Sequence, residues 1–112
     1  MADGLGAVVQ SFTSYNEADI VAHIYETAAT TDGYLVNPAA LTRFGVPLRQ
    51  ALTDSLRPYV ELHFSNISAM GWSQGGATTP FATAVAMGLR HYSYMGALFG
   101  FIQLLDAQEA QA

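Results

Sequence analysis

The chain has 112 residues, the size of one small domain, and we expect residues 1–112 to fold as a unit. Hydrophobic residues make up 51% of the chain and charged residues 12%, and the net charge is -5. The chain has four arginines and no lysine. This balance argues against nucleic-acid binding, and no apolar run is long enough to span a membrane.

The composition also bears on location and assembly. The chain has no cysteine, so it has neither disulfides nor a thiolate metal site. Its first residues lack the basic start and apolar run of a signal peptide, which favours a cytoplasmic protein. Because a small domain has much surface for its volume, so few charges predict that part of the surface is buried in a homo-oligomer.

The hydrophobic pattern divides the chain into strands and helices. Helical spacing predicts a helix that begins near Ser14, which has capping-box spacing to Glu17, and further helices over residues 43–56 and 93–108. A loop rich in glycine, serine and threonine is predicted at residues 68–79. The predicted strands are residues 7–12, 34–36, 58–65 and 81–89. Strands that alternate with helices predict an α/β fold, a parallel sheet with helices on both faces.

The strand predicted at residues 58–65 carries the residues best suited to chemistry. By the two-residue period of a strand, Tyr59, Glu61, His63 and Ser65 share one face. If Glu61 and His63 form a hydrogen bond, the carboxylate fixes the tautomer of the imidazole and raises its basicity, as acid–base catalysis requires. The alternative is an edge strand with a solvated polar face, and the spacing alone does not decide between them.

Polar residues follow two of the predicted strands. Asn37 ends the strand at residues 34–36, either as a plain turn residue or as an amide that a ligand could use. Residues 65–67 end the next strand and offer a hydroxyl, an amide and backbone N–H groups. Ligands of open α/β sheets bind at the carboxyl ends of the strands, so we expect a site there.

Several segments resemble, in the same order, those of type II 3-dehydroquinate dehydratases. Residues 32–42, Asp-Gly-Tyr-Leu-Val-Asn-Pro-Ala-Ala-Leu-Thr, are similar to that family's Asp-Gly-Ile-Val-Ile-Asn-Pro-Gly-Ala-Tyr-Thr. Residues 46–52 resemble its Val-Ala-Leu-Arg-Asp-Ala-Leu. Residues 60–67, Val-Glu-Leu-His-Phe-Ser-Asn-Ile, resemble its Val-Glu-Val-His-Leu-Ser-Asn-Ile. Pro80 and residues 88–98 also fit, so the resemblance extends from about residue 5 to residue 105.

The resemblance implies a flavodoxin-like fold, trimers that often build dodecamers, and a small-molecule substrate. It also implies an anti-elimination of water through an enolate, with no metal, Schiff base or other cofactor. In that family His63 would be the general acid that protonates the leaving hydroxyl, Glu61 the carboxylate beside it, and Asn37 a substrate contact. The substrate carboxylate would be held by Ser65, Asn66 and Ile67.

The chain also departs from the family pattern. The family's first strand is missing, as is the lid that carries its general-base tyrosine. Arg43 stands where the family has a histidine and could add a positive charge for substrate binding, and Gln50 replaces an aspartate. We therefore expect an enzyme repurposed for a lyase, cyclase or isomerase step on a small oxygenated molecule, with Glu61 and His63 transferring protons. The alternatives are a non-catalytic ligand-binding or assembly domain and, less favoured, the parent dehydration of 3-dehydroquinate to 3-dehydroshikimate.

The missing first strand matters for the sheet. In the family's strand order, 2-1-3-4-5, that strand is central, so its loss leaves backbone groups on both sides without partners. We expect four strands, with residues 7–12 moved over to pair directly with residues 34–36. In the alternative arrangement, a segment from another chain occupies the place of the missing strand.

Overall fold

Three parallel strands form the centre of the computed structural model, which describes residues 3–70 and 76–111. They are β1 (Tyr34–Val36), β2 (Tyr59–His63) and β3 (Ala84–Met87), in the order β1-β2-β3. Leu35 lies opposite Val60, and Leu62 lies opposite Ala86. The predicted parallel α/β sheet is confirmed, and β2 is its central strand.

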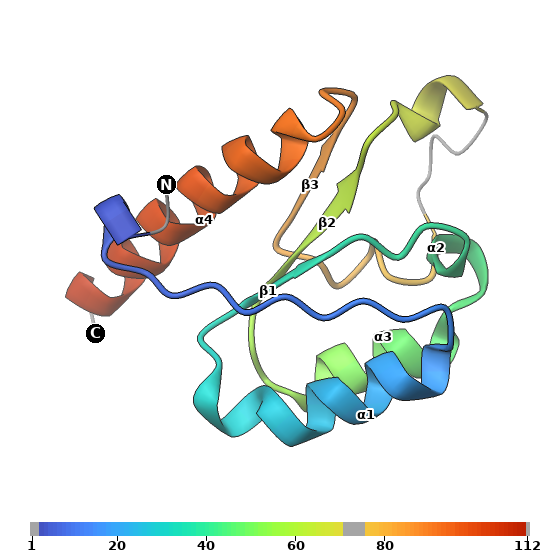
Figure 1. Ribbon diagram of the computed structural model, residues 1–112, viewed down its shortest axis with the longest axis horizontal. Coiled ribbons are helices and arrows are strands. Elements are labelled where there is room, and N and C mark those ends of the chain that lie inside the picture. Colours follow the sequence, from blue (N-terminus) through green and yellow to red (C-terminus); the bar gives the residue numbers. More distant parts are fainter. Residues whose placement is uncertain (1–2, 71–75, 112) are drawn as a thin grey trace.

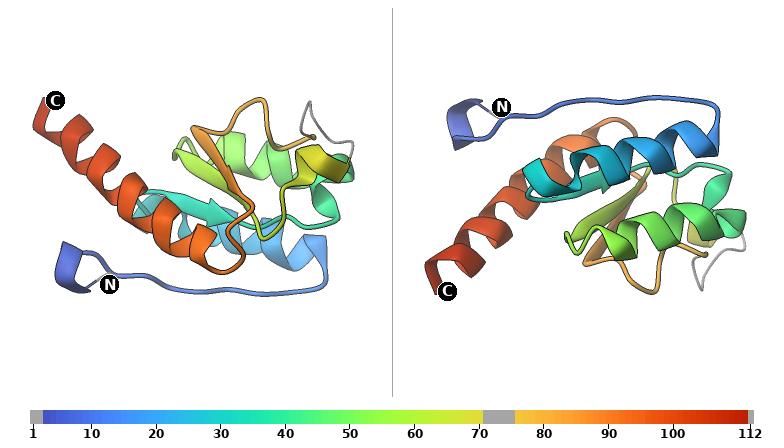
Figure 2. Two further views of the ribbon diagram at one scale, coloured as in Figure 1. Left: turned by 90° about the horizontal axis from the view of Figure 1, so that it is seen from above. Right: turned by 90° about the horizontal axis from the view of Figure 1, so that it is seen from below.

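Helices cover both faces of this sheet (Figures 1 and 2). One face carries α1 (Glu17–Thr27) and α3 (Val46–Asp54), and the other carries α4 (Tyr92–Gln111). The remaining helical segments are α2 (Leu41–Phe44) and three short 3-10 turns, Asp3–Leu5, Ala28–Thr30 and Ile67–Met70. No helix within residues 3–70 and 76–111 combines the length and apolarity that a membrane span requires.

Two predicted helices have different bounds in the structure. The helix predicted over residues 43–56 is two helices, because the chain turns at Gly45, whose N–H donates to the carbonyl of Leu41. The first helix begins later than the Ser14 capping box implies. Its N-cap is Asn16, whose Oδ1 accepts from the N–H of Ala18 at 2.9 Å, as polar N-cap residues do.

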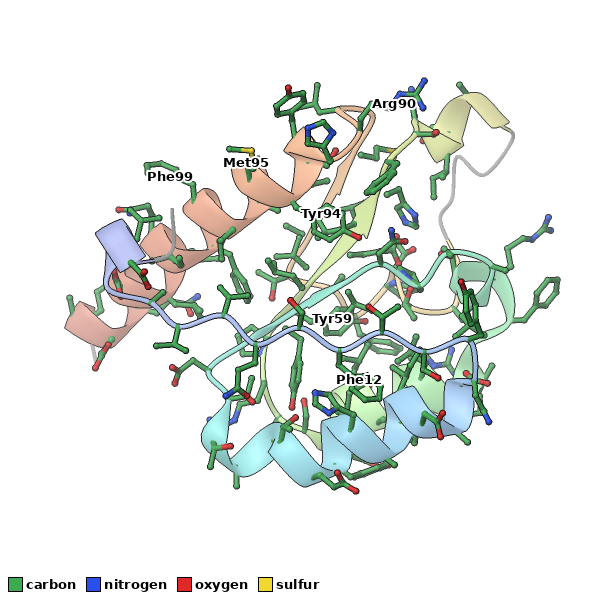
Figure 3. The ribbon with its side chains drawn as sticks, viewed as in Figure 1. Phe12, Tyr59, Arg90, Tyr94, Met95 and Phe99 are labelled. Carbon is green, nitrogen blue, oxygen red and sulfur yellow. The ribbon has the colours of Figure 1, made fainter. Side chains whose placement is uncertain are left out.

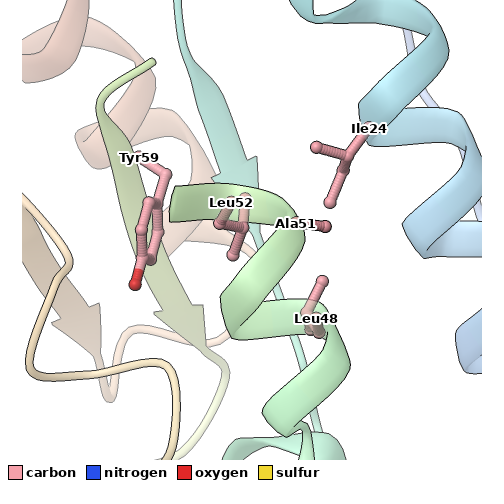
Figure 4. Packing of buried hydrophobic residues seen from close by; sticks show 5 residues of the cluster. All are labelled: Ile24, Leu48, Ala51, Leu52 and Tyr59. Carbon is pink, nitrogen blue, oxygen red and sulfur yellow. The ribbon is translucent and has the colours of Figure 1, made fainter. Parts of the chain in front are cut away.

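The apolar residues form two clusters, one on each face of the sheet. On the first face Ile24 of α1 and three α3 residues pack against Tyr59 of β2 (Figure 4). On the second face Val60 and Leu62 of β2 pack against Phe101 of α4. Tyr59 and its neighbours Val60 and Leu62 on β2 therefore contact opposite helical layers, and all five residues of the strand are buried.

The fourth strand was predicted wrongly. Residues 7–12 are extended, but they make no backbone hydrogen bond among the described residues and do not pair with β1. The Phe12 ring instead stacks on the His23 ring of α1, with 4.2 Å between the ring centroids. The strand predicted at residues 81–89 is also shorter, because a turn in which the Ala82 N–H donates to Thr79 precedes it.

Candidate functional site

Glu61 and His63 lie at the carboxyl end of β2 and form a buried pair. Their side chains are 1% and 5% exposed, and His63 Nε2 lies 2.9 Å from Glu61 Oε2. The interpretation of β2 as a solvated edge strand is therefore wrong. Because the carboxylate accepts a hydrogen bond, the Nε2 atom carries the proton, and Nδ1 is the ring nitrogen left for a substrate.

Two threonines hold the carboxylate of Glu61 from its other side. The Thr78 hydroxyl donates to Oε1, and the Thr79 hydroxyl lies 2.9 Å from Oε1 and 3.0 Å from Oε2. Thr78 is fully buried. Three donors on one buried carboxylate compensate for its loss of water and fix its orientation toward His63.

The loop that carries these threonines is attached to two other elements. The hydroxyl of Tyr59, also on β2, donates to the carbonyl of Thr78, and burial, together with the charge of Glu61, raises the pKa of Tyr59 to about 12. The N–H of Ala77 donates to the carbonyl of Thr42 in α2. A Cβ added at Gly76 would lie 1.9 Å from that same carbonyl oxygen, so only glycine permits this close approach.

Asn37 follows β1 at the same edge of the sheet, but its amide has other partners. Its Nδ2 donates to the Tyr94 hydroxyl at 2.9 Å, and its Oδ1 accepts from the Ala39 N–H at 3.2 Å. Tyr94 reaches from α4 toward the strands (Figure 3) and packs edge to face on Phe64, with 5.5 Å between centroids. Among the described residues no hydrogen bond joins Asn37 to His63.

The other predicted site residues are mostly exposed. Ser65 and Asn66 lie at the surface after β2, and Asn66 Oδ1 accepts from the Ser68 N–H at 3.1 Å. Ile67 is buried at 7% exposure. Arg43 lies in α2 with its guanidinium 5.9 Å from the centroid of the Phe44 ring. The family resemblance also implies that a substrate-binding arginine of the family is replaced near Gln74, a position that lies outside the described residues. The structure thus brings Glu61 and His63 together, and the binding role of the other residues stays a prediction.

Sequence reasoning did not identify Thr78, Thr79 and Tyr94 as site residues. The adjacent threonines before Pro80 are the only local signal, and they read equally well as loop residues. Their contact with Glu61 joins positions 17 and 18 residues apart, so it depends on the fold. Tyr94 meets Asn37 across 57 residues for the same reason.

These groups define a class of site. A buried carboxylate that orients an imidazole at the carboxyl edge of a parallel sheet can hold and donate a proton. Across residues 3–70 and 76–111 there is no cluster of three or more histidine, cysteine, aspartate or glutamate residues that could bind a metal ion. The fold and the site are those of an α/β protein equipped for acid–base chemistry.

Comparison with known proteins gives the family. Residues 1–102 match the family model described as class II dehydroquinase, so the chain belongs to that family. It is 36% identical over 94 residues to the catabolic 3-dehydroquinase of Aspergillus clavatus, a match that covers 83% of this chain and 63% of the relative. It is 30% identical over 112 residues to the 3-dehydroquinate dehydratase of Aliarcobacter butzleri, covering 99% of this chain and 68% of that relative. The chain therefore spans just under two thirds of the length of its fungal relative.

Solved structures share the fold. The type II dehydroquinase of Propionibacterium acnes matches with a TM-score of 0.82 and 24% identity, covering 91% of this chain and 76% of that chain. A 3-dehydroquinate dehydratase-like protein from Bifidobacterium longum matches with a TM-score of 0.72 and 27% identity, covering 94% and 80%. The predicted flavodoxin-like fold is confirmed, with three strands in place of the predicted four.

Proposed function

We propose that this chain is a carbon–oxygen lyase that eliminates water from a small hydroxylated ketone, with His63 as the proton donor. The observation that carries the proposal is the buried hydrogen bond of 2.9 Å between His63 and Glu61. Relatives from Aspergillus clavatus and Aliarcobacter butzleri bear the names 3-dehydroquinase and 3-dehydroquinate dehydratase. Their names make 3-dehydroquinate the first substrate to test.

In this reaction solvent water takes a proton from the carbon next to the ketone, which gives an enolate. The enolate re-forms the ketone as a carbon–carbon double bond forms and the carbon–oxygen bond breaks. The leaving hydroxyl takes a proton from Nδ1 of the His63 imidazolium and departs as water. Glu61 faces Nε2, so it stabilises the positive charge of the imidazolium before the transfer and keeps the ring oriented.

Substrate binding is proposed for the residues around this pair. Asn37 uses one N–H on Tyr94, so its second N–H can donate to a substrate oxygen. Ser65 and the backbone N–H groups of residues 66 and 67 would bind a carboxylate.

The test follows the conversion of 3-dehydroquinate to 3-dehydroshikimate, a conjugated ketone, by ultraviolet absorbance. We expect wild-type protein to exceed the buffer rate, His63→Ala to reduce the excess at least about 100-fold, and Glu61→Gln to reduce it less. His91→Ala is the matched control, because His91 is exposed and its ring lies against that of its neighbour Tyr92, away from Glu61 and His63 in the sequence. Circular dichroism checks folding, and His63→Gln replaces His63→Ala if the latter unfolds. A folded wild-type chain no faster than buffer, or full activity in the His63 variants, would overturn the proposal.

A further inference from the structure

A pair of neighbouring hydrogen-bond donors lies at the carboxyl edge of the sheet, just after β1. The Asn37 amide has two N–H bonds, and one of them donates to the Tyr94 hydroxyl at 2.9 Å. Because the Tyr94 oxygen accepts this bond, its own proton points away from Asn37. Among the described residues neither that proton nor the second Asn37 N–H has an acceptor. The two donors are therefore open to an oxygen atom of a ligand.

The turn after β1 decides which end of the Asn37 amide faces Tyr94. The Oδ1 atom accepts from the Ala39 N–H at 3.2 Å, and a flipped amide would set two N–H donors against each other there. Ala39 holds this position with a backbone φ of 50°, in the left-handed region that residues with a Cβ rarely adopt. The amide nitrogen therefore faces Tyr94, and the tyrosine hydroxyl accepts from Asn37 and donates elsewhere.

The ring of Tyr94 is held by packing. Tyr94 reaches from α4 toward the strands (Figure 3) and lies edge to face on Phe64, with 5.5 Å between the ring centroids. The half-buried ring also packs against the apolar cluster that contains Val60, Leu62 and Phe101. A phenylalanine at this position would keep these contacts, so the hydroxyl can be removed without removing the packing.

The donor pair begins one strand away from His63. Val36 lies opposite Glu61 in the parallel pairing, so Asn37 lies one residue short of the level of His63, across a strand spacing of about 4.8 Å. Asn37 bonds to α4 through Tyr94, whereas His63 shares the opposite face of β2 with Glu61. A small ring that lies across the ends of β1 and β2 would meet His63 with one oxygen and the donor pair with another.

The chemistry of the pair selects the kind of oxygen that it binds. A substrate hydroxyl would need an acceptor for its own proton, and the Tyr94 oxygen already accepts from Asn37. A ketone oxygen only accepts hydrogen bonds, so it matches a pair that offers donors alone.

We propose that Tyr94 is a catalytic residue whose hydroxyl, together with the second N–H of Asn37, binds the ketone oxygen of the substrate and stabilises the enolate. This inference rests on the proposed elimination from a hydroxylated ketone. When water takes the proton, the electron pair of the broken C–H bond forms a carbon–carbon double bond. The electron pair of the carbonyl double bond then moves onto oxygen, where two donors stabilise the negative charge as in an oxyanion hole.

Hydrogen exchange on the substrate tests the enolate without requiring elimination. With His63→Gln the leaving hydroxyl has no proton donor, so 3-dehydroquinate in deuterium oxide should exchange the hydrogens next to its ketone and keep its hydroxyl. Nuclear magnetic resonance of the ligand measures this exchange at saturating ligand. We expect the His63→Gln chain to exceed the buffer rate. Adding Tyr94→Phe should reduce the excess at least about 10-fold, because one of the two donors is lost.

Tyr92→Phe is the matched control and should leave the exchange unchanged. Tyr92 lies on the same helix and is 59% exposed, and its hydroxyl has no hydrogen bond among the described residues. Circular dichroism checks that each variant is folded. Elimination by the wild-type chain is measured separately. Exchange without elimination would therefore refute the proposed lyase and support the enolate site.

A second measurement separates a donor from a residue that only positions Asn37. Replacement of Tyr94 by 3-fluorotyrosine keeps the ring, and the fluorine makes the hydroxyl a stronger donor and a weaker acceptor. We expect exchange at or above the rate with tyrosine. Three results would overturn the proposal: exchange by the folded His63→Gln chain no faster than buffer, an unchanged maximal rate with Tyr94→Phe, or a fall to the Tyr94→Phe rate with 3-fluorotyrosine.

Discussion

Substitution by valine should change the free energy of unfolding in opposite directions at two buried threonines. Thr78 and Thr42 are both 0% exposed, but the Thr78 hydroxyl donates to Glu61, whereas the Thr42 hydroxyl has no hydrogen-bond partner among residues 3–70 and 76–111. Valine keeps the shape of threonine and removes the hydroxyl. A hydrogen bond to a charged group contributes about 1.5–3 kcal/mol, so Thr78→Val should lower the free energy of unfolding by that amount. Thr42→Val removes an unpartnered buried polar group and should raise it by about 1 kcal/mol.

Urea denaturation followed by circular dichroism measures both changes. With a slope of about 1–3 kcal/mol per molar urea, the two midpoints should lie roughly 1 M or more apart, on either side of the wild type. Thr53→Val is the control, because Thr53 is exposed and its hydroxyl donates to the Arg49 carbonyl within α3, so its effect should stay within about 0.5 kcal/mol. If Thr42→Val destabilised the chain as much as Thr78→Val, the reasoning that the hydrogen bond to Glu61 distinguishes the two sites would be refuted.

Two further predictions concern the surface. The Tyr25 hydroxyl lies 2.6 Å from Asp54, and this hydrogen bond, followed by that of the Gln50 amide, lowers the pKa of Asp54 from its ordinary value of 3.8. The hydrogen bonds to the ionised carboxylate therefore stabilise the fold above about pH 4, and this stabilisation is lost as the pH falls through the lowered pKa. Tyr25→Phe should therefore lower the melting temperature at pH 6 and have less effect at pH 2, and an equal effect at both would contradict this. We also expect a homo-oligomer built from trimers, since Met95 and Phe99 are half-exposed on the side of α4 turned from the strands (Figure 3). Light scattering at micromolar concentration checks the mass, and 12.0 kDa would count against it.

The sequence predicted what depends on local spacing. The two-residue period of a strand placed Glu61 beside His63, and the structure shows their hydrogen bond. Residues 34–36 form a strand with the predicted bounds, since Asn37-Pro38 ends it in a way that can be read from the sequence alone. The helix predicted from residue 93 starts one residue earlier, within the usual uncertainty of helix ends.

The errors concern interactions between distant segments. The pattern of residues 7–12 is that of a strand, but a strand needs a neighbour, and this segment does not pair with β1; its Phe12 ring stacks on His23 of α1. From its spacing, a solvated polar face was one of two alternatives for β2, yet Glu61 is buried because the loop at residues 76–79 folds over it and supplies two hydroxyls. The local sequence pattern predicts neither the contact between the loop and Glu61 nor the position of α1, since both depend on how the layers pack.

The residues proposed for proton transfer and for substrate binding lie on separate strands of the sheet. Glu61 and His63 lie on the central strand, and their hydrogen bonds come from each other and from the loop at residues 76–79. Asn37, in contrast, directly follows β1, the strand with the open edge. A change in the position of β1 would therefore act on the bond from Asn37 to Tyr94, and so on the proposed substrate binding, more than on the proposed proton transfer by His63.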